Sequence, residues 1–193
     1  MCSKQALPAA IITISGVAGV GKTTLAKGLL ERVADLRMLL SVTTRPARTS
    51  DLPGEYRYVT GAEFKALEED GKLLYPNTVH GNWYALWRED VDRAVSDTTP
   101  VLRILTPDGV RWLRSYIPGR VLSLFLIHPE ESVLRERMRR RGDTSAEQAR
   151  RILECREWSK EARKQPQQFH CIEPGSPSQT LSAALEVISR KHR

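Results

Sequence analysis

The chain has few cysteines, no long apolar segment and no internal repeat. Its three cysteines, Cys2, Cys155 and Cys171, are odd in number and widely spaced, so they offer neither a disulfide framework nor the spacing of a zinc site. No apolar run approaches the ~20 residues of a membrane-spanning helix, and the N-terminal stretch lacks the layout of a signal peptide. These absences argue against small disulfide-bonded folds and membrane proteins, and we expect a cytoplasmic protein.

The composition is that of an ordinary globular domain, with 40% hydrophobic and 27% charged residues among 193. This length suits one α/β domain with a proper core. The net charge of +7 is concentrated between Arg135 and Lys164, where 11 Lys and Arg residues stand against 6 Asp and Glu, a local excess of 11 − 6 = +5. A nucleic-acid surface, a lid that clamps phosphate and a solvated helix face would each produce such a run.

Apolar strands alternate with helices along most of the chain. Continuous apolar segments predict buried strands of the parallel type, and segments with apolar residues at helical spacing predict the helices between them. The expected strands cover residues 10–15, 100–106, 120–127 and 169–173, and the expected helices cover 22–34, 129–164 with a break at Gly142, and 178–190. This alternation predicts a mostly parallel sheet with helices on both faces.

Residues 41–92 have a different character and are expected to form an insert of mixed structure. The segment GEYRYVT, residues 54–60, alternates like a strand. Thr60 and Glu63 form the pattern of a capping box at the start of a helix. The other elements expected here are two strands within residues 72–86, joined near His80, Gly81 and Asn82, and a helix at residues 89–95.

The segment GVAGVGKT, from Gly16 to Thr23, fits the phosphate-binding pattern G-x-x-x-x-G-K-[ST] between a strand and a helix. Glycines let backbone N–H groups converge on phosphate oxygens, and the helix N-terminus adds partial positive charge. We expect Lys22 to reach the β- and γ-phosphates of ATP and the Thr23 hydroxyl to bind Mg²⁺. The alternative is a glycine-rich turn with an exposed lysine. The expected ATP-binding residues are Gly16, Val17, Ala18, Gly19, Val20, Gly21, Lys22, Thr23 and Thr24.

The stretch SVTTRPARTSDLPGEYRYVTGAEF, from Ser41 to Phe64, resembles the acceptor segment of guanylate kinases, in which S-x-T-T-R-x-x-R precedes a glycine, a tyrosine and a helix. Together with the P-loop, VHGNWY and RMRRRG…RRI, the resemblance covers most of the chain. It implies an ATP-dependent kinase that uses Mg²⁺ and has a P-loop NTPase three-layer fold. The implied single domain has a core of about 9–40, 98–135 and 166–193, an acceptor-binding insert of about 41–92 and a helical lid of about 136–150.

By the same resemblance, five residues hold the phosphate of the acceptor. A phosphate monoester dianion needs guanidinium groups for bidentate contact and hydroxyl donors to complete its shell, and these residues supply both. Pro46 stiffens the loop that carries the two arginines, although any such pair could also be ordinary surface arginines. The five residues are Ser41, Arg45, Arg48, Tyr56 and Tyr84.

The basic run fits the implied lid. Arg137 and Arg141 lie four residues apart and so share a helix face, and Arg151 lies on the next helix. The resemblance implies that these three arginines close over the transferring phosphoryl group and act with Lys22 in catalysis. Because the run lacks aromatic residues apart from Trp158, the lid explains it better than a nucleic-acid surface does. Three other arginines of the run, Arg139, Arg140 and Arg150, are expected to face solvent.

Four positions that would help to read guanine or bind the metal have lost the expected polarity. Guanylate kinases place a glutamate where this chain has Tyr75 and a serine or threonine where it has Leu86. They place two aspartates where it has Ile104 and Thr106. We therefore expect Tyr75, Leu86 and Thr106 to line an acceptor pocket that does not match guanine. A shift of the alignment by two residues would instead bring Asp108 into the site.

The resulting hypothesis is a kinase for a nucleoside monophosphate with a non-standard base pocket. The alternatives are a sugar-phosphate kinase of the ribose 1,5-bisphosphate type, an ordinary guanylate kinase with a divergent pocket, and a non-catalytic binding module. A non-catalytic binding module should have lost the P-loop lysine, but this chain keeps it as Lys22. The expected partners are ATP and a small phosphorylated acceptor, without nucleic acid or membrane, in a monomer or homodimer.

Overall fold

The computed structural model describes residues 10–79, 81–97, 99–140 and 142–190. A five-stranded parallel sheet, in the order β2-β7-β1-β8-β9, forms the core. The central strand β1 pairs with β7 and β8 and is buried along its whole length, because helices pack on both faces of the sheet; this explains its mostly apolar sequence. The strands are β1 (Ile11–Ser15), β2 (Arg37–Met38), β7 (Val101–Ile104), β8 (Val121–Leu126) and β9 (His170–Ile172).

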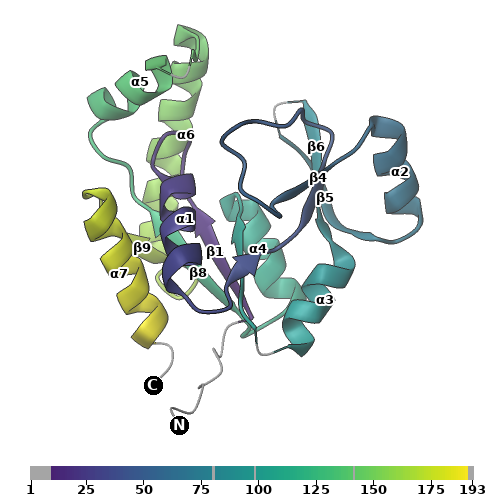
Figure 1. Cartoon of the computed structure of the whole chain (residues 1–193). Coiled ribbons are helices and arrows are strands. Elements are labelled where there is room, and N and C mark those ends of the chain that lie inside the picture. The colour runs from purple at the N-terminus through teal and green to yellow at the C-terminus, as the bar shows by residue number, and fades with distance from the viewer. Residues whose placement is uncertain (1–9, 80, 98, 141, 191–193) are drawn as a thin grey trace.

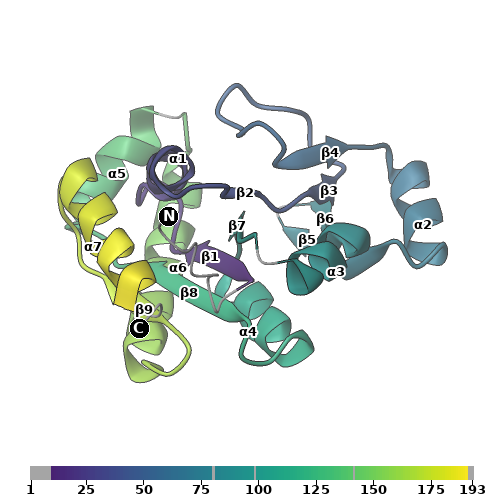
Figure 2. The same ribbon diagram turned by 60° about the horizontal axis from the view of Figure 1, so that its bottom comes forward.

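Helices cover both faces of this sheet, which gives three layers (Figure 2). Ile12 packs in a cluster with residues of α1 and α7 on one face, and its neighbour Ile11 packs in a cluster with residues of α3 and α4 on the other. The alternation follows from the strand geometry, in which successive side chains point to opposite faces. The mostly parallel α/β fold expected from the sequence is therefore confirmed. The helices are α1 (Lys22–Arg32), α3 (Arg88–Ser96), α4 (Pro107–Tyr116) and α7 (Pro177–Arg190).

A second, inserted sheet carries the acceptor segment. Its order is β4-β3-β6-β5, with β3 and β4 parallel and the other neighbours antiparallel. The capping box expected from Thr60 and Glu63 is present at the start of α2. The strand expected at 54–60 is shorter than predicted, and β3 was not predicted. The elements are β3 (Ser41–Thr43), β4 (Tyr56–Tyr58), α2 (Gly61–Glu69), β5 (Leu73–Val79) and β6 (Asn82–Trp87).

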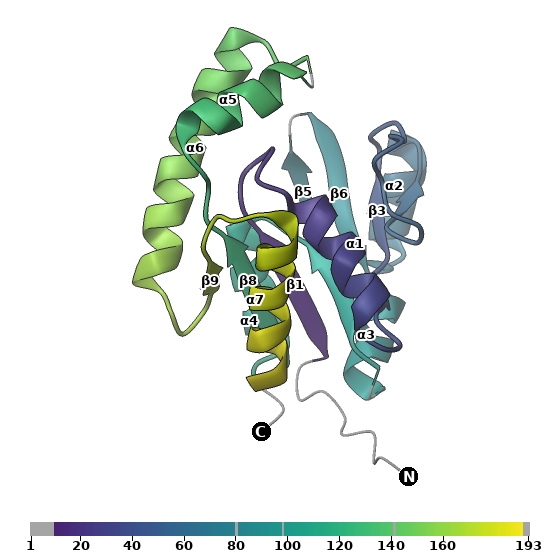
Figure 3. The same ribbon diagram turned by 60° about the vertical axis from the view of Figure 1, so that its left-hand side comes forward.

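Two further helices, α5 (Glu131–Arg140) and α6 (Ser145–Lys164), form a hairpin. The hairpin and the inserted sheet rise on either side of the loop that precedes α1 (Figures 1 and 3). The helix break expected at Gly142 is present: its φ of +84° favours glycine, and Thr144 caps α6 with a capping box. This arrangement places the loop between two projecting elements.

Within the described ranges, no helix is long and apolar enough to cross a membrane. Cys155 and Cys171 are both free thiols. Cys155 of α6 lies in a buried cluster with Leu134 and Met138 of α5, between the two helices of the hairpin, and burial raises its thiol pKa to about 12. It therefore stays protonated at neutral pH and serves as a small apolar residue.

Candidate active site

The P-loop, Gly16–Thr23, joins β1 to α1 and requires glycine at specific places. Gly16 has a φ of +139°, and a Cβ there would stand 2.9 Å from the Leu126 carbonyl oxygen. Gly21, with a φ of +112°, is the N-cap of α1 and makes no side-chain cap. The first N–H groups of α1 therefore have no side-chain oxygen at this cap, which suits them to an anion.

Lys22 folds back across this loop. Its Nζ donates hydrogen bonds to the carbonyl oxygens of Gly16 and Val17, both at 2.8 Å. The lysine thus holds its charge against the loop, where it can meet a bound phosphate. Thr23 follows it in the first turn of α1, and Val17 is buried in the core.

One cavity, about 330 Å³ in volume, brings together the P-loop, the insert and α6. Three segments that are distant in the sequence therefore present their side chains to a common space. The expected site residues that line it are Gly16, Ala18, Gly19, Lys22, Ser41, Arg48, Tyr56, Tyr75, Tyr84, Leu86, Thr106 and Arg151. Those that do not line it are Val17, Val20, Gly21, Thr23, Thr24, Arg45 and Arg137, and Arg141 lies outside the described residues.

Ser41 and Tyr56 occupy neighbouring, paired positions of β3 and β4 in this cavity. Ser41 is 1% exposed, and its hydroxyl has no hydrogen-bond partner within the described part of the chain. Buried hydroxyls are normally paired, so an unpaired one beside a cavity is suited to a polar ligand. Burial raises the pKa of Tyr56, whose ring lies 6.2 Å from that of Tyr84. The Tyr56 phenol therefore remains a hydrogen-bond donor at neutral pH.

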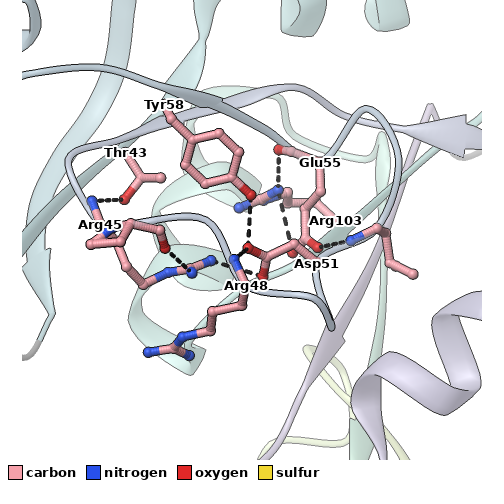
Figure 4. Close-up of polar contacts among 9 residues, drawn as sticks. Thr43, Arg45, Arg48, Asp51, Glu55, Tyr58 and Arg103 are labelled. Atoms are coloured by element: carbon pink, nitrogen blue, oxygen red, sulfur yellow. Dashed lines mark hydrogen bonds and ion pairs between the residues drawn. The ribbon is translucent and has the colours of Figure 1, made fainter.

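Arg45, expected to contact the acceptor, is instead engaged within its own loop (Figure 4). Its Nη2 donates to Asp51 Oδ1 at 2.9 Å and its Nη1 to the Pro46 carbonyl oxygen at 2.7 Å. Asp51 also accepts from the Arg48 backbone N–H and the Tyr58 hydroxyl, each at 2.7 Å. Arg45 therefore holds the shape of the loop, whereas the Arg48 side chain is exposed and lines the cavity.

Tyr75, one of the altered positions, stands at an irregularity in β5. The register of β5 with β6 shifts between Leu74 and Asn77, and Tyr75 has a φ of +52°. Its ring lies 5.1 Å from that of Trp112 and packs against Gly109, where a Cβ would meet the ring at 3.3 Å. The phenol therefore covers the N-terminal turn of α4.

The other altered positions leave this part of the cavity mostly apolar. Leu86 is buried and Ile104 is half-buried. The Thr106 hydroxyl accepts a hydrogen bond from the Gly109 N–H at 3.2 Å as the N-cap of α4. Asp108 does not line the cavity, because its largely exposed side chain pairs with Arg111. The structure thus gives no support to a replacement of the missing aspartates by Asp108.

The lid residues approach the P-loop from two helices. Arg137 of α5 donates from Nη1 to the Gly19 carbonyl oxygen at 3.1 Å. Arg151 of α6 pairs with Asp143 and lines the cavity, and its Nε is buried without a hydrogen-bond partner among the described residues. The three arginines that were expected to face solvent are all exposed. Arg139 and Arg140 pair with Glu136, and Arg150 pairs with Glu154.

Sequence reasoning missed several residues of the cavity. Most of them are apolar or amide side chains that nothing in the sequence marks as functional. Arg103 could have been found, because it is a charged residue within the apolar strand segment VLRIL. Glu154 and Trp158, on the same helix as Arg151, also reach the cavity. The missed residues that the argument uses below are Arg103 and Glu154.

A second cavity of about 270 Å³ borders the P-loop at Val20. Arg137 of α5 lines it, together with Glu173, Pro174 and Gly175 of the loop between β9 and α7. The P-loop therefore has one cavity on the side of the insert and another beside α5. A nucleotide whose phosphates lie on this loop can place its nucleoside in the second cavity.

The donor set around the P-loop fits a metal ion that arrives with a nucleotide. No group of three or more acidic, histidine or cysteine side chains suited to a metal occurs within the described ranges. Thr23 offers a hydroxyl beside the loop, and Glu154 offers a carboxylate that already pairs with Arg150. Mg²⁺ keeps several waters and takes substrate phosphates as ligands, so it needs few protein donors here.

The loop, the parallel sheet and the inserted second sheet define a P-loop protein of the three-layer α/β class. The chain belongs to the guanylate kinase family, whose match extends over residues 9–173. It is 36% identical to a guanylate kinase of Rhizobium meliloti over 138 residues, which are 71% of this chain and 63% of that protein. A guanylate kinase of Agrobacterium fabrum is 33% identical over the same length and with the same coverage. The chain thus spans less than two thirds of the length of the curated relatives that it matches.

Solved structures share the fold at lower identity. A guanylate kinase from Anaplasma phagocytophilum superposes with a TM-score of 0.70 at 22% identity, and the match covers 97% of this chain and 87% of that one. A gluconokinase from Sinorhizobium meliloti has a TM-score of 0.53 at 19% identity, and the match covers 95% and 93% of the two chains. At these identities the likeness concerns the fold alone.

Proposed function

We propose that the protein transfers the γ-phosphoryl group of ATP to the phosphate of a small monoester, and that this acceptor is a nucleoside monophosphate other than GMP. One observation carries the proposal: Lys22 of the P-loop shares a cavity with Ser41, Arg48 and Tyr56 of the insert. Donor phosphates on the loop and an acceptor phosphate on the insert would therefore meet in one space. An acceptor oxygen attacks the γ-phosphorus, the bond to the bridging oxygen breaks, and ADP leaves with that electron pair.

The chain's own residues would contribute positioning and charge. The N–H groups of the P-loop and Lys22 would bind the donor phosphates, and Arg151, with Arg137 and Arg141 of the lid, would neutralise charge on the transferring group. A single well-placed arginine can be worth ~10³-fold or more in such transfers. Val20 and Arg137 border the second cavity, which we assign to the nucleoside of ATP.

Mg²⁺ would be held by the Thr23 hydroxyl, by phosphate oxygens and by water. When bound, it neutralises charge that develops on the β- and γ-phosphates. Ile104, the last residue of β7, stands where the family pattern has its first aspartate, so the protein offers the metal fewer ligands than that pattern would. We therefore propose that the ion is bound chiefly as its complex with ATP.

The cytoplasmic location, the division into core, insert and lid, and the monomeric or homodimeric state stay predictions.

The base pocket is the part of the acceptor site that departs from guanine recognition. A guanine between Tyr75 and Leu86 would leave its N1 and N2 hydrogens without a carboxylate. Each unmet buried donor costs ~1–3 kcal/mol, and sites that depend on such bonds discriminate by up to ~10⁴–10⁵. Asn77 is a poorer match than a carboxylate: its Nδ2 donates to the carbonyl oxygens of Tyr75 and Tyr84 at 2.9 and 3.2 Å, which leaves one neutral amide oxygen to accept from guanine. A base with a less polar edge suits this pocket better.

The test is a coupled ATP-to-ADP assay across GMP, dGMP, AMP, the pyrimidine monophosphates and ribose 1,5-bisphosphate. We expect turnover with at least one nucleoside monophosphate, at a kcat/KM in the typical range of ~10⁴–10⁸ M⁻¹s⁻¹, and a much lower value with GMP. Preference for GMP would refute the altered pocket but keep the kinase. Preference for ribose 1,5-bisphosphate would replace the nucleotide by a sugar phosphate. Absence of turnover with every acceptor would favour a non-catalytic binding module.

A further inference from the structure

Arg103 is a charged side chain on a buried strand of the core sheet. It lies on β7, between Leu102 and Ile104, and is only 3% exposed. A buried guanidinium is costly unless its charge and its N–H groups are matched. Its partners therefore indicate what the residue is placed to do.

The protein satisfies only part of this guanidinium (Figure 4). Nη1 donates to the Glu55 carbonyl oxygen at 2.9 Å and more weakly to that of Leu39 at 3.5 Å. The Glu55 carboxylate is 3.8 Å away and also accepts from the Leu52 N–H, so it is a shared and distant counter-ion. Nε is buried without a hydrogen-bond partner among the described residues. The Nε–H is thus left for another acceptor.

The surroundings of Arg103 are those of the proposed acceptor phosphate. Its Cζ lies 4.5 Å from the centre of the Tyr56 ring, and it lines the same cavity as Ser41. The Ser41 hydroxyl, which lies beside Tyr56 in the strand register, is likewise a buried polar atom without a partner among the described residues. An oxyanion would satisfy both groups, because each can donate and charge-assisted hydrogen bonds to oxyanions are the strong ones.

We infer that Arg103 binds the phosphate of the acceptor directly, as the buried arginine of that site, while Arg45 shapes the loop. The inference rests on the proposed function, since it assigns a residue to the acceptor of that reaction. Among described residues, the cavity lining then has four basic side chains, Lys22, Arg48, Arg103 and Arg151, against Glu154 alone. Such a lining selects a dianionic phosphate monoester over a neutral nucleoside or sugar.

A purely structural role is the competing explanation, because Arg103 also joins the core strand to the insert through the Glu55 carbonyl. Arg120 provides a matched control. It is half-buried, has a buried Nε without a partner among the described residues, and donates to the Val95 carbonyl oxygen at 3.1 Å, yet it does not line the cavity. Arg103→Leu and Arg120→Leu thus both remove a partly satisfied guanidinium, but only one removes it from the site.

The experiment is an NMR titration of ribose 5-phosphate, with ribose as the uncharged comparison, into the wild type, Arg103→Leu, Arg103→Lys and Arg120→Leu. We expect Arg103→Leu to bind ribose 5-phosphate about 10- to 100-fold more weakly than the wild type, the usual effect of losing a charged hydrogen bond. Arg103→Lys keeps the charge without the fork and should recover part of that loss. Affinity for ATP should stay unchanged in both, and Arg120→Leu should match the wild type within about twofold.

Wild-type affinity for ribose 5-phosphate in Arg103→Leu would overturn the inference, as would a wild type that does not bind the probe. If Arg103→Leu does not fold, wild-type affinity in Arg103→Lys would overturn it equally. The coupled assay distinguishes a failure of the inference about Arg103 from a failure of the proposed function. Arg103-dependent binding without turnover of any monoester would keep the site and reject the kinase. Turnover with an acceptor KM that is unchanged in Arg103→Leu would keep the kinase and reject the site.

Discussion

Arg45 and Asp51 form an ion pair inside the acceptor loop, with Nη2 and Oδ1 2.9 Å apart and both side chains largely buried. Because the same carboxylate accepts from the Arg48 N–H and the Tyr58 hydroxyl, one acidic side chain fixes three parts of the loop. The pair explains why Arg45 is absent from the cavity that Arg48 lines.

Asp51→Asn should lower the unfolding midpoint at neutral pH and flatten its dependence on acid pH. Although partial burial opposes it, the hydrogen bonds from Arg45 and Tyr58 hold the pKa of Asp51 below its usual value. A group whose pKa is lower in the folded state contributes stability that is fully present above its unfolded pKa of about 3.9. That contribution disappears as pH falls through the folded-state pKa. Thermal unfolding from neutral to about pH 2 measures the difference.

Asp108→Asn is the control for this measurement. Its carboxylate is 73% exposed and pairs with Arg111 on the same helix, and exposed pairs contribute only ~0–1 kcal/mol. We expect its acid profile to follow that of the wild type. If Asp51→Asn retains the wild-type profile as well, the loop does not depend on the ion pair.

Lys22→Ala should lower kcat by ~10²-fold or more, because it removes a preorganised cation from the phosphate site. Its Nζ lies 2.8 Å from two P-loop carbonyl oxygens, so the charge is already in place before ATP binds. The coupled assay measures this, with Lys27→Ala as the control, since Lys27 is exposed on the same helix. A mutant at position 22 that turns over acceptor at the wild-type rate would contradict the role of the loop.

The P-loop was predictable because its chemistry is local: a strand, glycines at fixed spacing, a lysine and a helix follow one another in the sequence. The acceptor site could be predicted from the sequence only in part. The spacing of Arg45 and Arg48 places both on one loop, but it could not show that Asp51 engages the first and leaves the second to the cavity. Arg103 comes from β7, far from that loop in sequence, and reaches Tyr56 only because the insert folds against the core sheet. The charge of Arg103 within an apolar strand marks it as unusual, but its contact with Tyr56 leaves no local pattern.

The conformation of Tyr75 was equally hidden. A strand of alternating residues gives no reason to expect a φ of +52°, which arises where β5 shifts register against β6. The shift lets the ring pack on Trp112 and Gly109. The sequence could therefore identify the altered position but not the fact that its side chain lies against α4.

The lid and the insert should close further on the core when both substrates bind, because water near the γ-phosphate would allow wasteful hydrolysis. The Arg137 contact with Gly19 already connects α5 to the P-loop, so closure should start from this contact. Small-angle scattering with and without a bisubstrate analogue measures the change as a smaller radius of gyration. An unchanged radius at saturation would contradict closure, and Lys22→Ala, which should bind the analogue weakly, serves as the control.

The double substitution Tyr75→Glu with Leu86→Thr should raise the kcat/KM for GMP relative to the wild type's preferred acceptor. It supplies a carboxylate for the N1 and N2 hydrogens of guanine and a hydroxyl beside it, where the wild type presents a phenol packed on Trp112 and a buried leucine. Two such bonds correspond to a gain of roughly 30-fold or more if both form, since each unmet donor costs ~1–3 kcal/mol. Tyr75→Phe is the control, because it keeps the ring and its packing and should leave the order of acceptors unchanged. The glutamate at position 75 would also need the backbone to relax from its φ of +52°, so melting curves must show that the double variant is folded. A folded variant whose GMP activity does not rise would mean that guanine, if it binds, is read by residues other than these two.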